Sequence, residues 1–310
     1  MTTASTITVW LPQPGWVEAM GGLPDRMTAD VWTGGEQLPA SADQVEVVVL
    51  PFGLPGSRLP VLAKLPTLRL IQLMSAGAER VIPHVPAGVT LCNARGAHDP
   101  AVAEWIMAVI LAQARLLPTF ARQQQAGIWA PAASEPLAGQ TVLIVGYGSI
   151  GETVEHLLTP FGVTVERAAR HARPGVSGID DLPALLPRAD IVILLVPVTP
   201  ATTRLADAGF LGQLRDGALL VNAARGSVVD TGAQLAELTT GRLRAALDVT
   251  DPEPLPSGHP LWSAPGLLLT PPGAGLSTRA FPRARAVVRD QLARYAAGEP
   301  LHNVVGAQGY

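Results

Sequence analysis

The chain has 310 residues, of which 48% are hydrophobic and 15% are charged, and its formal net charge is −3. This composition supplies enough apolar side chains for two packed cores, and it argues against nucleic acid or an anionic membrane as a partner. Cys92 is the only cysteine, so an intrachain disulfide is excluded, and we expect a cytoplasmic protein. The first residues lack the pattern of a signal peptide, and the apolar stretches are too short to span a bilayer.

The first hundred residues alternate between short apolar runs and segments of helical or turn character. The runs are rich in β-branched residues and predict strands at 7–10, 45–50, 68–73 and 89–92. Such alternation predicts a parallel sheet covered by helices. Ser75, Ala76 and Gly77 follow one of these strands, at the end where open α/β sheets bind ligands. They are either a ligand-binding loop or a plain strand-to-helix turn.

Residues 98–115 predict a helix. Asp99 is a good capping residue, Pro100 fits the first helical position, and the segment ends near Pro118. The segment is apolar nearly all round, so we expect it to be buried between layers. We interpret it as the helix that crosses from a first domain into a second.

A second alternation begins at residue 137. Its predicted strands lie at 141–145, 163–167, 191–196, 218–222, 244–248 and 267–270, and its predicted helices lie near 152–158, 182–186, 207–214 and 232–239. Six strands with intervening helices predict a doubly wound dinucleotide domain. A final amphipathic helix, near 279–297, contains five arginines and is expected to pack on the first domain.

The strand predicted at 141–145 runs directly into Gly146-x-Gly148-x-x-Gly151. In dinucleotide-binding loops the first glycine permits a tight turn, the second lets the backbone approach a pyrophosphate, and the third lets the helix pack closely. The diphosphate would bind N–H groups at the helix N-terminus. The predicted coenzyme loop therefore consists of Gly146, Tyr147, Gly148, Ser149, Ile150 and Gly151.

These patterns predict an α/β protein of two doubly wound parallel-sheet domains with a cleft between them. A Rossmann nucleotide domain, residues 99–283, is inserted in a flavodoxin-like substrate domain formed by residues 1–98 and 284–310.

Further motifs follow the later strands of the second domain. They read Val196-Pro197-x-Thr199-x-x-x-Thr203, Ala223-Ala224-Arg225-Gly226 and Asp248-x-x-x-Pro252-Glu253-Pro254. With the glycine loop, Asn93-x-x-Gly96 and Ala101-Val102-Ala103-Glu104, they resemble the D-isomer-specific 2-hydroxy-acid dehydrogenases over nearly the whole chain, most of all the glyoxylate and hydroxypyruvate reductase branch. The resemblance implies hydride transfer to a small 2-oxo acid, giving the D-2-hydroxy acid, and a homodimer formed through the nucleotide domain.

The resemblance also implies a role for each matching residue. Arg225 matches the arginine that holds the substrate carboxylate and polarises the 2-oxo group, a task that suits a planar guanidinium. The N–H groups of Ala76 and Gly77, in the loop that begins at Ser75, match the loop that holds the other end of that carboxylate. Glu253 matches the acid that orients a catalytic histidine. Coenzyme contacts are implied at Val196, Pro197, Thr203, Ala223, Ala224, Arg225, Asp248, Pro272 and Gly275.

Pro272 occupies the position where the family carries its catalytic histidine. Glu253 would donate the proton, directly or through water, if burial kept it protonated. Alternatively, His98 or His259 enters the cleft. A third alternative is an imine substrate, because an iminium carbon becomes a neutral amine on accepting hydride and needs no proton donor. A non-catalytic NADP(H)-binding protein is a further alternative, against which the retention of both Arg225 and Glu253 argues.

The segment after the second strand of the nucleotide domain predicts NADP(H) in preference to NAD(H). Ala169 stands where NAD users carry an acidic residue, and Arg170, His171 and Arg173 follow it. Basic side chains there suit a 2′-phosphate. The alternative is a solvated basic loop.

Two further expectations concern partners. The six histidines are scattered, so we predict no metal site. Trp129, just before the nucleotide domain, is expected to close a dimer contact or to line the cleft.

Overall fold

The computed structural model describes residues 6–306, which divide into two compact units. Unit 1 comprises residues 6–98 and 277–306, and unit 2 comprises residues 99–276. The chain therefore returns to unit 1 at Ser277 rather than at residue 284, where the sequence places the boundary. Residues 1–5 and 307–310 of the predicted first domain lie outside the described part of the chain.

Unit 1 contains a five-stranded parallel sheet with the order β2-β1-β3-β4-β5, which is the flavodoxin-like arrangement. Four of its strands lie where the apolar runs predict them, and β2 does not. β2 was missed because its sequence, Met-Thr-Ala-Asp-Val, is partly polar and mostly accessible to solvent. The strands are β1 (Ile7–Leu11), β2 (Met27–Val31), β3 (Val45–Val49), β4 (Leu70–Gln72) and β5 (Thr90–Cys92).

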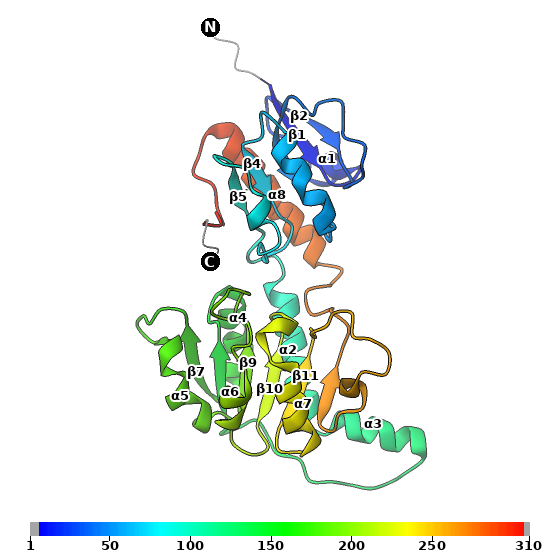
Figure 1. Ribbon diagram of the computed structural model, residues 1–310, viewed down its shortest axis with the longest axis vertical. Helices are drawn as coiled ribbons and strands as arrows, with labels where there is room; N and C mark the ends of the chain where they lie inside the picture. The colour runs from blue at the N-terminus through cyan, green and yellow to red at the C-terminus, as the bar shows by residue number, and fades with distance from the viewer. Residues whose placement is uncertain (1–5, 307–310) are drawn as a thin grey trace. The chain divides into compact units, whose positions relative to one another are not determined.

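Helices cover both faces of the unit 1 sheet (Figure 1). The α-helices α1 (Trp16–Ala19) and α8 (Ala280–Ala297) pack their apolar side chains against one face. The 3-10 helices η1 (Gly56–Lys64) and η2 (Ile82–His84) cover the other face. A parallel sheet needs this double cover because both of its faces are apolar.

Unit 2 contains a seven-stranded sheet with the order β12-β11-β10-β9-β6-β7-β8, in which every neighbouring pair is parallel. The order is that of a doubly wound dinucleotide domain. A two-residue edge strand, β8, extends the six strands that the sequence predicts. The strands are β6 (Thr141–Val145), β7 (Thr164–Ala169), β8 (Ser177–Gly178), β9 (Ile191–Leu194), β10 (Leu219–Asn222), β11 (Arg244–Leu247) and β12 (Leu267–Leu269).

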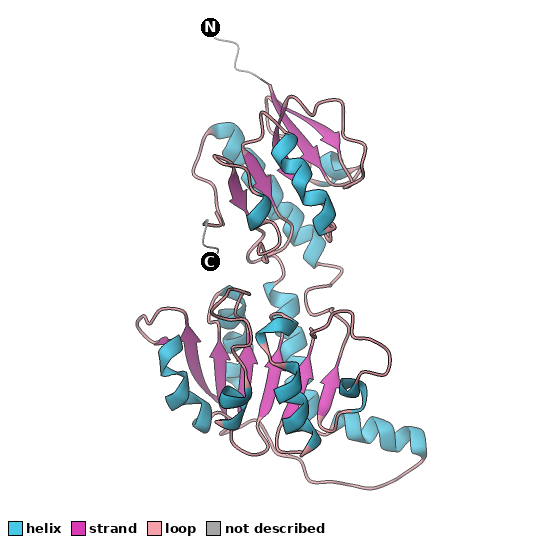
Figure 2. Ribbon diagram, in the orientation of Figure 1, coloured by secondary structure: helices cyan, strands magenta, loops and turns pink. Residues whose placement is uncertain are grey.

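Two layers of helices enclose the unit 2 sheet (Figure 2). On one face lie α2 (Asp99–Ala114) and α4 (Ser149–Leu158), which pack on apolar residues of β6, β9 and β10. On the other face lie α5 (Leu182–Leu185), α6 (Ala208–Gly212) and α7 (Thr231–Thr239). As expected, α2 is largely buried. The division between the units falls at its first residue, so α2 belongs to unit 2.

The helix α3 (Leu117–Ala126) was not predicted. It is polar, none of its residues is buried, and it projects from unit 2 before the chain returns to β6 (Figure 1). Among residues 6–306 no single helix is long and apolar enough to cross a membrane. Only α2 and α3 taken together pass that test, and they are bent by 63°.

Candidate coenzyme and carboxylate sites

The predicted coenzyme residues follow the carboxyl ends of six strands of unit 2. Because these strands are parallel, the loops that follow them emerge along one edge of the sheet. Gly146–Gly151 follow β6, residues 170–173 follow β7, and residues 196–203 follow β9. Ala223–Arg225 follow β10, Asp248 follows β11, and Pro272 and Gly275 follow β12.

The three glycines of the loop after β6 are required for different reasons. Gly146 has φ +99°, and a Cβ there would lie 2.6 Å from the backbone of Leu195 and Val196. A Cβ on Gly151 would lie 3.1 Å from the Tyr147 ring, whereas one on Gly148 would meet nothing within 4 Å. Protein packing therefore explains Gly146 and Gly151, and Gly148 borders open space. The first turn of α4 directs N–H groups without intrahelical acceptors toward this end. These residues fit a dinucleotide pyrophosphate.

A cluster of polar side chains supports this loop. The Tyr147 hydroxyl donates to Glu155 Oε2 at 2.5 Å, and Arg167 Nε donates to the same oxygen at 2.7 Å. A second bond joins Arg167 to Glu155 Oε1. The Arg167 hydrogen bonds lower the pKa of Glu155, while burial and then the Glu155 bond raise the pKa of Tyr147. Sequence reasoning missed this cluster, in which the charge of Arg167 is compensated.

The basic residues after β7 lie at the predicted place. Ala169 ends β7, and Arg170, His171 and Arg173 are exposed. Arg173 Nη2 donates to the carbonyl of Tyr147 at 2.7 Å, and its guanidinium lies 5.9 Å from the centroid of that ring. The guanidinium of Arg173 is thus attached to the coenzyme loop.

Glu166, a carboxylate three residues before Ala169, lies within β7. It pairs with Arg188 at 3.1 Å.

Arg225 follows β10 in a loop that is held by Asn222. The buried Asn222 accepts from the Ala224 N–H at 3.0 Å and donates to the Arg225 carbonyl at 2.9 Å. A Cβ on Gly226 would lie 1.9 Å from the carbonyl oxygen of Thr250, so the loop after β10 packs directly on the loop after β11. The backbone at Arg225 is fixed, and its side chain is exposed.

Asp248 holds the loop that contains Pro272. Its buried Oδ1 accepts from the N–H groups of Gly273 at 2.8 Å and Ala274 at 2.9 Å. Thr270 directs its hydroxyl to the Leu247 carbonyl and to Asp248. Pro272 is exposed in this loop. In unit 2 Asp248 therefore supports the backbone, and the loop offers no histidine.

The three proposed proton donors, Glu253, His259 and His98, differ in exposure and in hydrogen bonding. Glu253 is exposed, and within residues 6–306 its carboxylate accepts no hydrogen bond and forms no ion pair. Proton donation by Glu253 depends on burial of its carboxyl group. Unit 2 by itself does not bury it. His259 Nδ1 accepts from the Leu261 N–H at 3.2 Å and caps a 3-10 helix. His98 is buried in unit 1, where its Nε2 bonds the Met74 carbonyl at 2.8 Å.

The loop after β4 in unit 1 presents three successive N–H groups. The Met74 carbonyl is bonded by His98 Nε2, the Ser75 carbonyl accepts from the Ala94 N–H at 2.9 Å, and the Ala76 carbonyl accepts from Asn93 Nδ2 at 2.7 Å.

All three donors come from residues 93–98, which follow β5. These peptides are trans, so the N–H groups of Ser75, Ala76 and Gly77 point away from that segment. Within the described chain these N–H groups have no acceptor. We call them the amide row. Successive backbone N–H groups without acceptors can bind an anion.

Among residues 6–306 we find neither a metal site nor a reactive cysteine. Within residues 6–306 no group of three His, Cys, Asp or Glu side chains is placed to hold a metal. Cys92 is buried, and burial raises the pKa of its thiol to about 11. It is an inert core residue.

Residues 107–273 match the D-isomer specific 2-hydroxyacid dehydrogenase family, NAD binding domain. The chain belongs to this family. It is an NAD(P)-dependent 2-hydroxyacid dehydrogenase, an oxidoreductase with the predicted pair of parallel-sheet domains.

Relatives of this dehydrogenase include reductases of two small oxo acids. It is 30% identical to glyoxylate/hydroxypyruvate reductase A of Yersinia enterocolitica, across 94% of this chain and 95% of that one. A D-isomer specific 2-hydroxyacid dehydrogenase from Xanthobacter autotrophicus, solved with NADPH and MES, has a TM-score of 0.85 and 29% identity, across 98% and 99% of the two chains. An NADPH-dependent glyoxylate/hydroxypyruvate reductase from Sinorhizobium meliloti, solved with NADP and sulfate, has a TM-score of 0.84 and 25% identity, across 99% and 100%.

Two alanine substitutions, at Gly148 and at Gly146, test the different roles of these glycines. Gly148→Ala is expected to leave the Tm unchanged and to weaken NADPH binding about tenfold or more, because its Cβ enters open space that the pyrophosphate needs. Gly146→Ala is expected to cost about 1–3 kcal/mol of stability through backbone strain alone, before its contact with Val196 is counted. Thermal unfolding and NADPH fluorescence titration measure both effects. Equal losses of Tm in the two variants would contradict this assignment.

Proposed function

We propose that this dehydrogenase reduces a small 2-oxo acid of the glyoxylate or hydroxypyruvate kind to the D-2-hydroxy acid with NADPH. The observation that carries the proposal is the amide row of unit 1, which is a receptor for a small anion such as a carboxylate. The relatives that act on glyoxylate and hydroxypyruvate support this substrate class. A cytoplasmic location belongs to the same proposal, supported by the single buried cysteine.

Each residue has a defined task in this proposal. The amide row holds the substrate carboxylate, and the guanidinium of Arg225 binds the substrate and polarises its 2-oxo group. The bound coenzyme supplies the hydride. We assign the proton to Glu253, directly or through water, on the condition that bound substrate and coenzyme bury its carboxyl group and keep it protonated. Glu253 has no other partner among the described residues, whereas His98 and His259 bond backbone groups.

Imine reduction is the second candidate. It is favoured by the loop after β12, where Pro272 carries no proton and the Thr270 hydroxyl is directed at Leu247 and Asp248. An iminium carbon that accepts hydride becomes a neutral amine, so its reduction needs no acid at this position.

The test is NADPH consumption with glyoxylate, hydroxypyruvate, pyruvate and phenylpyruvate, each with and without methylamine. We expect the wild type to reduce at least one oxo acid alone. Arg225→Lys is expected to lower kcat/KM by about 10- to 100-fold, because the forked contact of the guanidinium is lost. Arg188→Lys is the matched control, since Arg188 is exposed and pairs with Glu166.

Two results of this assay would contradict the oxo-acid assignment. Turnover that requires methylamine would move the assignment to imine reduction. NADPH binding without turnover by the wild type, with turnover only in Pro272→His, would leave a coenzyme-binding protein that has lost its acid.

The basic side chains after β7 support the proposed preference for NADPH. Between Ala168 and Val176 the chain has three basic side chains and no carboxylate. Glu166, the carboxylate of β7, pairs with Arg188, and the charge of Arg167 is compensated by Glu155. Arg170 and Arg173, which are exposed in this segment, are proposed to provide the charge for a 2′-phosphate.

We expect Arg170→Ala and Arg173→Ala to weaken NADPH binding by about tenfold or more each and to leave NADH binding nearly unchanged, because only NADPH carries the 2′-phosphate. Equilibrium titration of the coenzyme fluorescence measures both constants, with Arg188→Ala as the control. Tighter binding of NADH than of NADPH by the wild type would refute the preference.

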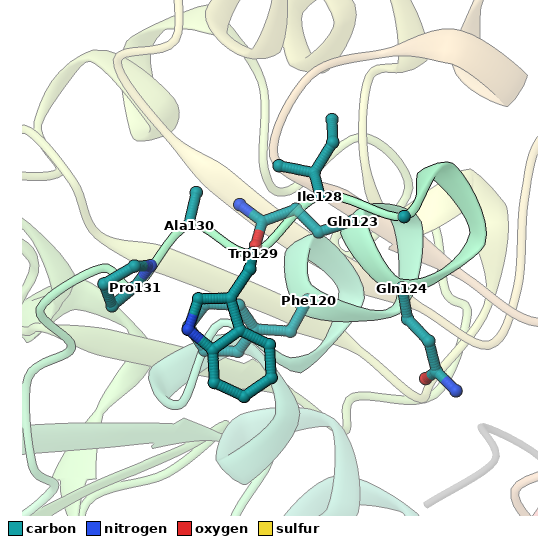
Figure 3. Close-up of a pocket in the computed structure, with 8 residues that line it drawn as sticks. Phe120, Gln123, Gln124, Ile128, Trp129, Ala130 and Pro131 are labelled. Atoms are coloured by element: carbon teal, nitrogen blue, oxygen red, sulfur yellow. The ribbon is translucent and has the colours of Figure 1, made fainter.

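A homodimer also belongs to the proposal. Trp129 is 98% exposed and Ile128 is 56% exposed, beside a hollow of about 600 Å³ that α3 and the following segment form. Figure 3 shows Phe120, Ile128 and Trp129 around this hollow. Exposed aromatic groups of this size mark interaction surfaces, and the proposed occupant is a second copy of the chain.

Trp129→Ser is expected to raise the dimer Kd by roughly thirtyfold or more, as the loss of a central tryptophan contact does. Sedimentation velocity across a concentration series measures the change. Trp262→Ser is the control, because Trp262 is also an exposed tryptophan of unit 2 and lies outside this hollow. A wild type that stays monomeric at high concentration would refute the dimer.

A further inference from the structure

The imidazole ring of His98 in unit 1 holds the first peptide of the amide row. Of its three anchoring bonds, one comes from the Ala94 backbone and two come from side chains, Asn93 and His98. The His98 bond sets the peptide between Met74 and Ser75, the first of the row. Its acceptor is a carbonyl oxygen, so Nε2 is the protonated nitrogen that donates.

The ring of His98 is held by packing as well as by this bond. His98 is 9% exposed, and its ring stacks on Phe52 with centroids 6.2 Å apart and planes at 27°. Phe52 is contacted edge-on by Phe281 at the start of α8, with centroids 5.4 Å apart. A buried donor with a packed ring has one orientation, and here it faces the loop.

Loss of this donor would free the Met74 carbonyl to rotate. Met74 is 6% exposed, and a buried carbonyl without a partner is unfavourable. The peptide would turn toward another donor, and because its carbonyl and N–H point in opposite directions, the N–H of Ser75 would leave the row.

We infer that His98 is a positioning residue for the substrate carboxylate, acting through the Met74 carbonyl to hold the amide row open, and that it is not the missing proton donor. This inference rests on the proposed function, since it names the residue that shapes the carboxylate half of that site. It also explains how a histidine in unit 1 serves the reaction while its Nε2 remains bonded to the backbone.

The experiment compares His98→Gln with His98→Leu. Glutamine places its Nε2 the same number of bonds from Cα as the histidine Nε2 and keeps the donor, whereas leucine removes it. We expect His98→Leu to raise KM for the oxo acid by about 10- to 100-fold with a much smaller change in kcat, and His98→Gln to stay within roughly threefold of the wild type. The Kd for NADPH should be unchanged in both variants, because the coenzyme loop lies in unit 2.

Two further variants separate positioning from folding. Asn93→Asp removes the donor to Ala76 and retains the acceptor for the Arg95 N–H, so it should also raise KM. His259→Leu is the matched control, a histidine that bonds backbone in unit 2, and it should leave KM unchanged. Thermal unfolding of every variant identifies any that fails to fold.

Three outcomes would overturn the inference. They are equal KM values for His98→Leu and the wild type, equal damage by Gln and Leu, and a loss of kcat at constant KM, which would make His98 a proton donor. If the wild type reduces no oxo acid, the proposed function fails by itself. Calorimetric binding of oxamate, an unreactive oxo-acid analogue, then tests His98 directly: weaker binding by His98→Leu supports the inference, and unchanged binding refutes it.

Discussion

Parallel pairing of neighbouring strands is the constraint on which both units depend. It requires a crossover between successive strands, so the chain must supply helical segments for two faces of each sheet. It also aligns the carboxyl ends of the strands, so six of the seven strands of unit 2 contribute a loop to the predicted coenzyme site. Groups from residues 146 to 275 are therefore brought to one edge of the sheet by the strand order itself.

The loops at these sheet edges are also held by the same kind of hydrogen bond. A buried polar side chain at or beyond a strand end bonds the backbone of a functional loop, as Asn222, Asp248 and Asn93 do. Each bond satisfies a side chain that would otherwise be costly to bury, and it fixes the direction of a peptide. The loops are therefore shaped by the protein interior, while their outward groups are left for ligands.

The sequence predicts the strands that are buried on both faces, because a short continuous apolar run such as Thr141–Val145 is typical of a strand enclosed between two layers of helices. It fails where burial is partial: β2 is partly polar, and α3 is mostly polar with no buried residue. The site residues carried by motifs are predicted from the sequence and stay predictions. The position of the amide row after a strand is readable from the sequence, but the direction of its N–H groups is not, because backbone N–H groups have no letter of their own. The anchoring role of His98 emerges only when the folded chain brings it to Met74, 24 residues earlier.

The bonds made by Asp248 leave position 272 without a part in holding its loop. The Asp248 carboxylate accepts from the N–H groups of residues 273 and 274 and from the Thr270 hydroxyl, so neither the amide nor the side chain of residue 272 holds the loop. Proline, which has no N–H group, fits there because no acceptor in the loop depends on that N–H. The position to which the family resemblance assigns a catalytic histidine thus lies where the fold places no demand on the side chain. Its chemical character is independent of the bonds that hold the surrounding loop.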